Sequence, residues 1–261
     1  MRCRLCDHDC TLAFERLVLG RHRVGYYACP DCGALQTEEP YWLDEAYDTA
    51  IAALDTGIVT RNLVAQAIVY LVGRIVRPAG RLIDFGGGTG MLCRMLRDIG
   101  LDAWLMDRYA EPVFARGFAL APEQATAAPV AILSCFEVFE HFAAVGPELD
   151  RLFALKPAVL VASTELYDGQ GADWPYLVAE TGQHVFFYSR RTMQHIAARH
   201  GYRYVGRGQF HFFLRDPLSS FRQRLLRAAI SRVGLRAARL AIAWRLDGHF
   251  SRRDQDALAG R

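Results

Sequence analysis

Apolar and polar residues in the middle of the chain form two kinds of segment in alternation. Short, nearly continuous apolar runs of strand length occupy residues 81–85, 103–106, 130–136 and 159–163. Apolar residues at helical spacing occupy residues 41–53, 60–76, 91–99, 145–155 and 190–200. Another strand is expected within residues 117–128, and residues 202–207 and 209–215 resemble a closing hairpin. This order predicts a doubly wound α/β fold with a seven-stranded, mostly parallel sheet.

The first apolar strand leads directly into a glycine-rich turn. Residues 82–92 read LIDFGGGTGML, so Asp84 is followed by Gly86, Gly88 and Gly90 at alternate positions, and then by a helix. A strand, a glycine turn and a helix N-terminus let the backbone approach a nucleoside cofactor closely. Met91 stands where the dinucleotide fingerprint G-x-G-x-x-G has its last glycine. The pattern therefore points away from NAD and toward S-adenosylmethionine (SAM).

The second strand ends in an acid, Asp107, 17 residues after Gly90. A carboxylate at the tip of this strand is placed to accept hydrogen bonds from both ribose hydroxyls of an adenosyl group. The alternative is that Asp107 caps a helix or lies in a solvated loop. The interpretation as a ribose ligand depends on the glycine turn that precedes it.

Five of the seven cysteines fall within the first 32 residues. Cys3-x-x-Cys6 and Cys29-x-x-Cys32 are two knuckles that can together surround one tetrahedral metal ion. Their spacing predicts a zinc ribbon, with disulfides or free thiols as the alternative. His8 and Cys10 are possible replacement ligands, but four cysteines already fill a closed structural site. We therefore expect structural Zn²⁺ in a module too small to be stable on its apolar core alone.

The fourth strand ends in the sequence E-V-F-E-H, residues 137–141. With the glycine turn and Asp107, this segment makes residues 81 to about 215 resemble a class I SAM-dependent methyltransferase of the small-molecule type. The resemblance implies that Asp84, Gly86, Gly88, Gly90, Asp107 and Glu137 bind the cofactor. It also implies that the residues after the fourth strand line the methyl-transfer site. The N-terminal zinc module is similar, more loosely, to that of methyltransferases acting on deoxysugars and polyketide-like metabolites.

Two histidines are candidates for the base that removes a proton from a hydroxyl acceptor. Histidine titrates near operating pH, and Glu140 or Glu137 could orient the ring of His141. The alternative role for His141 is to cap the next helix. His184 lies in a long loop after the fifth strand, where Rossmann-type ligands bind. Aromatic residues of that loop either line the acceptor pocket or pack the loop itself: Trp174, Tyr176, Phe186, Phe187 and Tyr188.

A metal ion is an alternative for the same residues. Glu137, Glu140, His141 and His184 match residue types in the small-RNA 2′-O-methyltransferases, where two Glu and two His bind a divalent ion. Such an ion activates a sugar hydroxyl as a Lewis acid. Many methyltransferases with E-V-x-E-H carry no metal.

Residues 217–261 are rich in arginine and have helical apolar spacing. One interpretation is two amphipathic helices that attach to an anionic membrane surface or a partner. The other is a helical pair packed on the core or on a dimer partner. We thus expect three parts: a zinc-ribbon-like module at 1–40, a SAM-binding methyltransferase domain at 41–216 and an amphipathic helical extension at 217–261.

Composition narrows the function classes. A formal net charge of +3 in 261 residues gives no general basic coat for nucleic acid. The N-terminal residues lack the apolar run of a signal peptide, and no run of about 18 apolar residues occurs, so we expect a cytoplasmic protein without a transmembrane helix. The leading hypothesis is methyl transfer to a small hydroxylated, carbohydrate-like or secondary-metabolite acceptor.

Two other functions compete with it. RNA methylation is one, because ribosomal-RNA guanine methyltransferases also join an N-terminal zinc module to this fold. The modest charge and the lack of an Asn-Pro-Pro-Tyr-like segment after the fourth strand weigh against it. A non-catalytic zinc-ribbon scaffold is the other, and the intact set of Asp84, glycines and Asp107 weighs against that.

Overall fold

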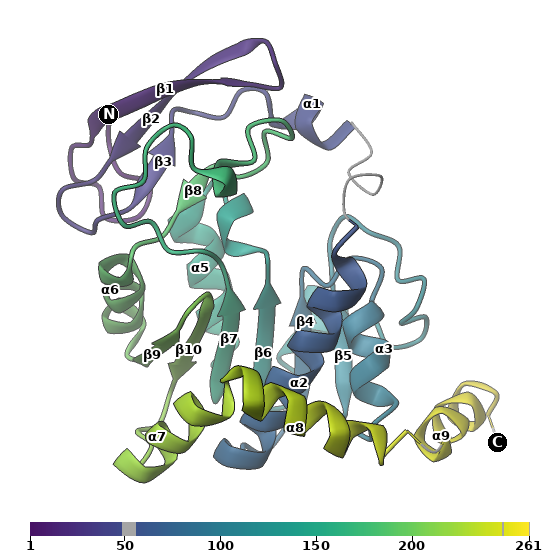
Figure 1. The fold of residues 1–261 in the computed structure, drawn as a ribbon. Helices are drawn as coiled ribbons and strands as arrows, with labels where there is room; N and C mark the ends of the chain where they lie inside the picture. Colours follow the sequence, from purple (N-terminus) through teal and green to yellow (C-terminus); the bar gives the residue numbers. More distant parts are fainter. Residues whose placement is uncertain (49–55, 247, 261) are drawn as a thin grey trace. The chain divides into compact units, whose positions relative to one another are not determined.

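The computed structural model describes residues 1–48, 56–246 and 248–260, which form two compact units. Unit 1 consists of Met1–Thr56, Glu137–Ala154 and Ala162–His211. Unit 2 consists of Gly57–Phe136, Leu155–Val161 and Phe212–Arg261. Figure 1 shows the chain with its elements labelled. Each unit gathers segments that lie far apart in the sequence, so neither follows the linear order of the three expected parts.

The α/β core is a six-stranded sheet with the strand order β5-β4-β6-β7-β10-β9. The first apolar strands are found where the sequence predicts them: β4 (Arg81–Phe85), β5 (Ala103–Met106), β6 (Val130–Phe136) and β7 (Val159–Ser163). The predicted hairpin is β9 (Arg203–Arg207) and β10 (Phe210–Leu214). Its two-residue connection suits antiparallel neighbours, whereas β4 pairs in parallel with both β5 and β6.

The prediction of a seventh strand is wrong for the described residues. Within 117–128, only an isolated parallel bridge between Leu105 and Ala119 is present. Pro122 then begins the short helix α4 (Pro122–Ala125). Proline fits the first turn of a helix but cannot donate to a strand ladder, and the alanine-rich residues that follow have low strand propensity. The segment therefore contacts the edge of the sheet without continuing it.

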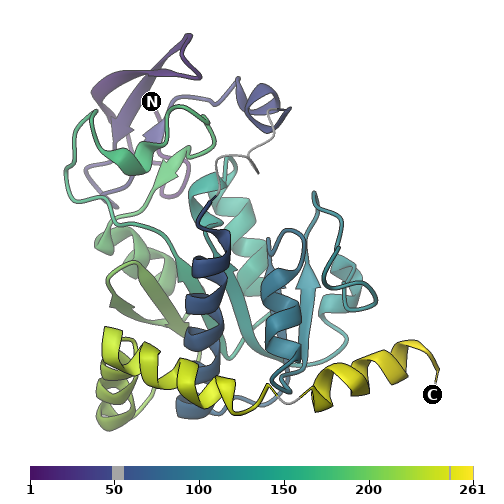
Figure 2. The same ribbon diagram turned by 45° about the vertical axis from the view of Figure 1, so that its right-hand side comes forward.

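In unit 2, helices α2 (Ile58–Val76) and α3 (Met91–Arg97) lie side by side beside the parallel strands (Figures 1 and 2). By length and a mean hydropathy of 1.3, α2 is also a candidate for a membrane span. Within unit 2, however, its residues Ala65–Val69 and Val72 are buried against α3, β6 and the C-terminal helices. This packing is that of a helix covering a sheet.

The arginine-rich extension forms three helices rather than two: α7 (Ser220–Ala229), α8 (Arg232–Ala243) and α9 (His249–Leu258). Ser219 and Ser231 cap α7 and α8 by accepting hydrogen bonds from backbone N–H groups. Helix α8 lies against α2, where Ala238 and Ile242 join Ala67 and Ile99 in a small apolar cluster. The packing alternative for this extension is therefore correct for the inner faces of its helices.

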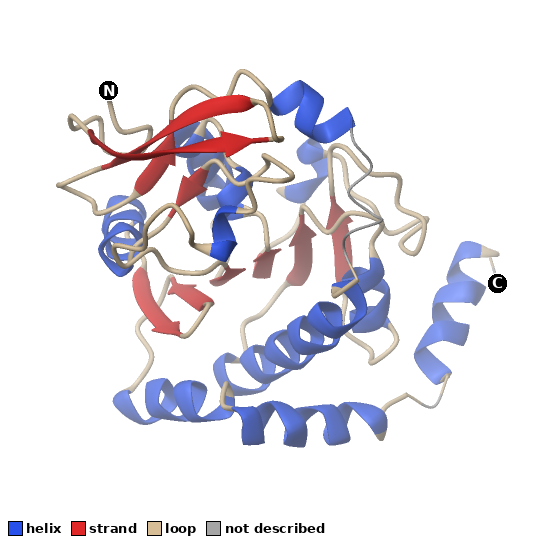
Figure 3. Ribbon diagram, turned by 45° about the horizontal axis from the view of Figure 1, so that its top comes forward, coloured by secondary structure: helices blue, strands red, loops and turns tan. Residues whose placement is uncertain are grey.

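In unit 1, the N-terminal residues form a four-stranded sheet of order β1-β2-β3-β8, whose long twisted pair β1 and β2 is clear in Figure 3. These strands are β1 (Thr11–Val18), β2 (His22–Ala28), β3 (Leu35–Thr37) and β8 (Phe186–Phe187). The sheet also takes its fourth strand from well outside residues 1–40 and pairs it with β3 in antiparallel fashion.

Buried aromatic side chains form a core in unit 1 that includes residues of this sheet. Tyr26, Trp42, Trp174 and Phe187 belong to one buried cluster. Phe186, Phe187 and Tyr188 are fully buried, so the expectation that they line an acceptor pocket is wrong and the packing alternative holds. The other helices of unit 1 are α1 (Leu43–Asp48), α5 (Val145–Ala154) and α6 (Arg190–His200). The rest of the helix predicted at 41–53 lies outside the described residues.

Candidate active site

The turn after β4 has the backbone that its glycines allow. Gly86, Gly88 and Gly90 have φ of 66°, 57° and 84°, in the left-handed region where a side chain is strained. A Cβ on Gly90 would approach the Cβ of Ala115 to 2.5 Å, whereas a Cβ on Gly88 would meet nothing within 4 Å in the described part of the chain. The turn is thus tight on its inner side and open at Gly88. Such an open stretch of backbone is what a cofactor needs to approach closely.

Asp84 is buried beside this turn. Its Oδ1 accepts a hydrogen bond from the hydroxyl of Ser134 at 2.7 Å, and its Oδ2 is buried without a hydrogen-bond partner among the described residues. A Cβ on Gly87 would lie 2.2 Å from that Oδ2, so the turn passes directly over the carboxylate. Burial, together with the negative charge of Asp107, raises the pKa of Asp84 to about 7 against the hydrogen bond from Ser134. An orphaned carboxylate oxygen next to the turn fits a site that receives a polar ligand.

Asp107 holds the other side of the turn. Its Oδ2 accepts the N–H of Gly88 at 2.9 Å, and its Oδ1 accepts those of Tyr109 and Ala110, each at 2.8 Å. These bonds form a turn in the loop after β5, where the described residues contain no helix for Asp107 to cap. A carboxylate has about four acceptor sites, and these three bonds leave one for a ribose hydroxyl.

Glu137 directly follows the last residue of β6 and belongs to unit 1. Its φ of 53° places it in the left-handed region, which is uncommon for a residue with a side chain. The hydroxyl of Ser163 accepts the N–H of Glu137 at 3.0 Å and donates to its Oε1 at 2.5 Å. These two bonds hold Glu137 in its strained conformation. Strain of this kind is concentrated at functional sites.

Glu140 is completely buried three residues later, in the 3₁₀ turn Phe139–His141. The hydroxyl of Tyr176 donates to its Oε1 at 2.6 Å, while Oε2 is buried without a hydrogen-bond partner in the part of unit 1 that is described. Burial raises the pKa of Glu140 to about 7, although the hydrogen bond from Tyr176 opposes this. A buried carboxylate oxygen with nothing to bind is costly unless a ligand or ion completes it.

The rings of His141 and His184 meet edge to face, with centroids 5.0 Å apart. Backbone carbonyls bond the Nδ1 atom of each ring: that of Gln183 for His141 at 3.2 Å and that of Tyr176 for His184 at 2.7 Å. A carbonyl only accepts, so Nδ1 carries the proton in both rings and Nε2 is the atom with the lone pair. The Nδ1 side of the His141 ring is thus held by the backbone carbonyl of Gln183.

Burial lowers the pKa of both histidines. Burial and the neighbouring His184 together lower the pKa of His141 to about 3, against its bond to the carbonyl of Gln183. Burial also lowers the pKa of His184, against its bond to the carbonyl of Tyr176. The expectation that His141 titrates near operating pH is therefore wrong. Both rings are neutral at pH 7 and present Nε2 as an acceptor or as a metal ligand.

The structure thus gathers the expected site residues into two groups. Asp84, the glycines and Asp107 lie together in unit 2. Ligand atoms of Glu140, His141 and His184 lie within 4.8 Å of one another in unit 1. Three residues that the sequence patterns did not indicate complete the two groups: Gly87, Ser134 and Ser163. Ser134 was open to detection, since it is the one hydroxyl in the apolar run of β6. Tyr176, expected as an aromatic residue of the acceptor loop, donates its hydroxyl to Glu140, which nothing in the local sequence indicates.

The four predicted cysteines form a separate site in unit 1. The Sγ atoms of Cys3, Cys6, Cys29 and Cys32 all lie within 4.8 Å of one another. Cys3 and Cys32 are 3.7 Å apart and Cys6 and Cys29 are 3.5 Å apart, near the roughly 3.8 Å between thiolates bound about 2.3 Å from a tetrahedral zinc. These distances exclude disulfides. The convergence of the two knuckles is confirmed.

The considered replacement ligands have other contacts. Cys10 is buried, and its thiol donates to the carbonyl of His8 at 3.8 Å. The ring of His8 lies 3.4 Å from the carboxylate of Asp31, and these two residues form, with Cys6, a second group whose ligand atoms lie within 4.8 Å of one another. The four cysteines by themselves supply the number of ligands that a closed tetrahedral site needs.

Three solved structures of methyltransferases are similar to part of the chain, each at less than 20% identity and with a TM-score below 0.5. The chain is similar to 1,6-didemethyltoxoflavin-N1-methyltransferase of Burkholderia thailandensis, at 11% identity over 77% of this chain and 97% of that one, with a TM-score of 0.49. It is similar to magnesium protoporphyrin IX methyltransferase of Synechocystis PCC 6803 (13%, 68% and 97%, TM-score 0.45). It is also similar to the methyltransferase domain of bacterial CtHen1 (17%, 59% and 98%, TM-score 0.43).

Comparison with curated proteins finds no match. The model of the family described as "Methyltransferase domain" matches residues 59–206, more than half of the chain. The matched range includes the glycine turn, Asp107 and the residues that follow β6. The chain therefore belongs to the methyltransferase domain family and is a SAM-dependent methyltransferase.

Proposed function

We propose that the enzyme methylates a hydroxyl group of a small carbohydrate-like or secondary-metabolite acceptor, with His141 or His184 taking the hydroxyl proton. The observation that carries this proposal is the orientation of the two imidazoles. Each ring donates from Nδ1 to a backbone carbonyl, which dedicates Nε2 to accepting a proton or binding an ion. Two such nitrogens beside an orphaned oxygen of Glu140 make a site for a hydroxylated ligand.

The turn after β4 would hold SAM. The open backbone at Gly88 would approach the nucleoside, Asp107 would accept from a ribose hydroxyl at its remaining acceptor site, and Asp84 would offer its orphaned Oδ2 to a donor of the ligand. Glu137, which directly follows β6 in the chain, is a further proposed ligand of the cofactor. When bound, SAM supplies a methyl group on a sulfonium, which is a good leaving group.

The protein's own part in the reaction is positioning and proton transfer. The acceptor oxygen must be held in line with the methyl group, and its proton must leave as the new bond forms. A neutral imidazole takes this proton at Nε2. Its low pKa makes it a weak base in the free enzyme, so it is effective only when a bound, partly alkylated acceptor has become strongly acidic. The carboxyl group of Glu140, whose pKa burial raises to about 7, stabilises the resulting imidazolium in its ionised form.

A divalent ion is a second candidate for the same cluster. One ligand atom from each of Glu140, His141 and His184 lies within 4.8 Å of the other two, and the carbonyls that bond both rings resemble the outer partners of metal-bound histidine. These three residues would hold the ion, which would lower the pKa of an acceptor hydroxyl. RNA, the alternative acceptor, is proposed together with this second candidate, the bound divalent ion.

The four cysteines would hold structural Zn²⁺. Their closed tetrahedron has no position for water, so the ion would stabilise unit 1 without taking part in catalysis. The enzyme would work in the cytoplasm, because its seven cysteines are free and a reducing compartment favours metal over disulfides in such a cluster.

The first test is SAM binding by calorimetry, with circular dichroism to establish that each variant is folded. Wild-type protein should bind SAM, and the Asp107→Ala variant should bind at least about tenfold more weakly through loss of ribose contacts. A folded wild-type protein that does not bind SAM would contradict the proposal.

The second test follows S-adenosylhomocysteine release with a panel of sugars, phenols, nucleosides and a small RNA. His141→Asn and His184→Asn keep a side-chain donor near the Nδ1 position but lack Nε2. Either or both should lower kcat by about 10²-fold or more, with little change in SAM affinity. Turnover with RNA alone would favour the alternative acceptor. Activity that survives metal removal with EDTA would favour an imidazole base over a bound ion.

A further inference from the structure

Helices α7 and α8 carry a second apolar face that points away from their packing partners. On α8, Val233 and Leu240 are 76% and 68% exposed, and Trp244, which caps the helix, is 89% exposed. Their spacing of seven and four residues puts them on one stripe of the helix. On α7, Phe221 and Leu225 are exposed one turn apart in the same way. The two helices thus present five large apolar side chains to solvent.

The core does not need these side chains. The inner faces of the helices are already provided by Leu226 and Ile230 on α7 and by Ala238 and Ile242 on α8, all of which are buried within unit 2. A helix that only covers a core has one apolar stripe and a polar opposite face. A second, solvent-facing stripe on each of two consecutive helices indicates a surface that binds something.

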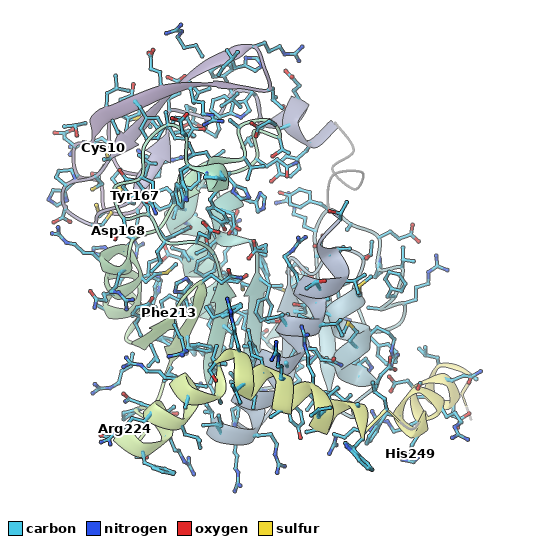
Figure 4. The ribbon with its side chains drawn as sticks, in the orientation of Figure 1. Cys10, Tyr167, Asp168, Phe213, Arg224 and His249 are labelled. Carbon is cyan, nitrogen blue, oxygen red and sulfur yellow. The ribbon has the colours of Figure 1, made fainter. Side chains whose placement is uncertain are left out.

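The charge around these stripes has a single sign. Residues 217–246 contain seven arginines and neither aspartate nor glutamate. The arginines of this stretch are Arg222, Arg224, Arg227, Arg232, Arg236, Arg239 and Arg245. In Figure 4, Arg224 lies on the outward side of α7. The rest of the chain nearly balances this charge, because the whole protein has a net charge of only +3. The positive charge is therefore concentrated where the exposed apolar residues are.

We propose that this α7–α8 surface binds to the surface of an anionic lipid bilayer. Arginine beside exposed aliphatic residues and a tryptophan is the combination that lies in the headgroup region, with rings and aliphatic chains inserted and guanidinium groups on lipid phosphates. Nucleic acid accounts for the arginines but leaves Val233, Leu240 and Phe221 unused. A second copy of the chain would bring two arginine-rich surfaces together, which is repulsive.

This surface lies on helices outside the proposed methyl-transfer site, so the inference does not depend on the proposed function. Tryptophan fluorescence offers a direct test, because Trp42 and Trp174 are buried while Trp244 is exposed. Vesicles of phosphatidylcholine with 30 mol% phosphatidylglycerol, about the anionic content of many bilayers, should shift the emission of the full-length protein to the blue. Vesicles of phosphatidylcholine alone, and inorganic phosphate in solution, should not. The Trp244→Phe variant should still sediment with the anionic vesicles but lack the blue shift.

Two further variants separate charge from insertion, with sedimentation as the measurement. Substituting Arg222, Arg232 and Arg236 by Gln should weaken binding to anionic vesicles by about 100-fold. Val233→Ser with Leu240→Ser should weaken it while leaving the dependence on salt unchanged. Leu12→Ser and Arg116→Gln, exposed elsewhere, are the matched controls and should bind like wild type.

Three results would overturn the proposal. The first is a folded wild-type protein that does not sediment with anionic vesicles. The second is binding to duplex RNA or DNA that the serine variants do not weaken. The third is a dimer that forms without lipid and shifts the emission of Trp244 by itself.

Discussion

Asp254 of α9 accepts two hydrogen bonds from the guanidinium of Arg97 on α3, at 2.7 and 2.8 Å, and both side chains are buried. Arg94 adds a third bond to Asp254 at 2.8 Å. Arg97 also donates to the carbonyl of Ala103 at 2.9 Å, and its guanidinium lies 3.5 Å from the ring centroid of Phe118. Helix α9 is thus attached by these contacts to α3, the helix that follows the glycine turn.

Removing this carboxylate should destabilise unit 2. Asp254→Ala leaves the buried Arg97 without its partner, which costs about 3–5 kcal/mol of unfolding free energy. Urea denaturation, followed by circular dichroism, measures this loss. Asp256→Asn, an exposed change on the same helix, is the control and should alter stability by less than about 0.5 kcal/mol. Equal stability of wild type and Asp254→Ala would contradict a role for the ion pair.

The same pair predicts acid sensitivity. Burial alone would raise the pKa of Asp254, but the hydrogen bonds from Arg97 and Arg94 outweigh it and hold the pKa below its ordinary value. A depressed pKa in the folded state stabilises the protein above the unfolded-state pKa of about 3.9, and this stabilisation is lost as pH falls through the folded value. The melting temperature of the wild type should fall between pH 5 and pH 2, and that of the Asp254→Asn variant should fall less.

Asp84 predicts the opposite dependence on pH. Its folded-state pKa is raised to about 7 by burial, above its ordinary 3.8. The folded state therefore binds the proton more tightly, and stability is fully present below about pH 4 and lost as pH rises through 7. Asp84→Asn is neutral at every pH, so it should be flatter between pH 5 and pH 9 and relatively more stable at pH 9. A wild-type stability that does not fall over this range would show that a ligand or water stabilises the ionised form.

Two neighbouring glycines should respond differently to alanine. Gly87→Ala places a Cβ against Asp84 and Leu105, at 2.2 and 2.8 Å, so the variant should lose thermal stability. Gly88→Ala has no such clash but retains a φ of 57°, a strain of about 1 kcal/mol. Its main effect should be weaker SAM binding, since the added methyl lies on the open side of the turn. Calorimetry and thermal melting of both variants measure the contrast, which vanishes if the turn does not contact the cofactor.

Metal analysis tests the cysteine site. Purified protein should contain about one equivalent of zinc, and Cys29→Ser with Cys32→Ser should contain none and melt at lower temperature. Cys93→Ser is the matched control, because Cys93 is buried in unit 2 and its thiol donates to the carbonyl of Ala103, a contact that serine reproduces. A second equivalent that is lost in His184→Asn would place an ion at the histidine cluster.

Local sequence predicts the parts of the fold that local physics determines. The apolar run of β6 is a buried central strand, and the alternate glycines before α3 form the tight turn. Within each cysteine pair the two residues are three positions apart, so each knuckle is itself a short-range structure. These features depend on residues within a few positions of one another, where propensity and spacing are informative.

What the sequence could not predict depends on long-range contacts. The bond between Tyr176 and Glu140 joins residues 36 positions apart, and that between Arg97 and Asp254 joins residues 157 positions apart. Burial, which only the fold determines, takes the histidines away from neutral titration. The strand expected within residues 117–128 does not form, because only Ala119 of that range pairs with Leu105 and Pro122 then begins a helix.

Because β3 pairs with β8, the N-terminal sheet of unit 1 can finish folding only after β8 has been synthesised. Leu35 lies opposite Phe187, so the N-terminal sheet acquires its last strand only after about 150 further residues have left the ribosome. Until then, the backbone edge of β3 that pairs with β8 is uncovered, as it would be in any fragment that stops near residue 40. The N-terminal sheet is therefore synthesised well before the strand that completes it.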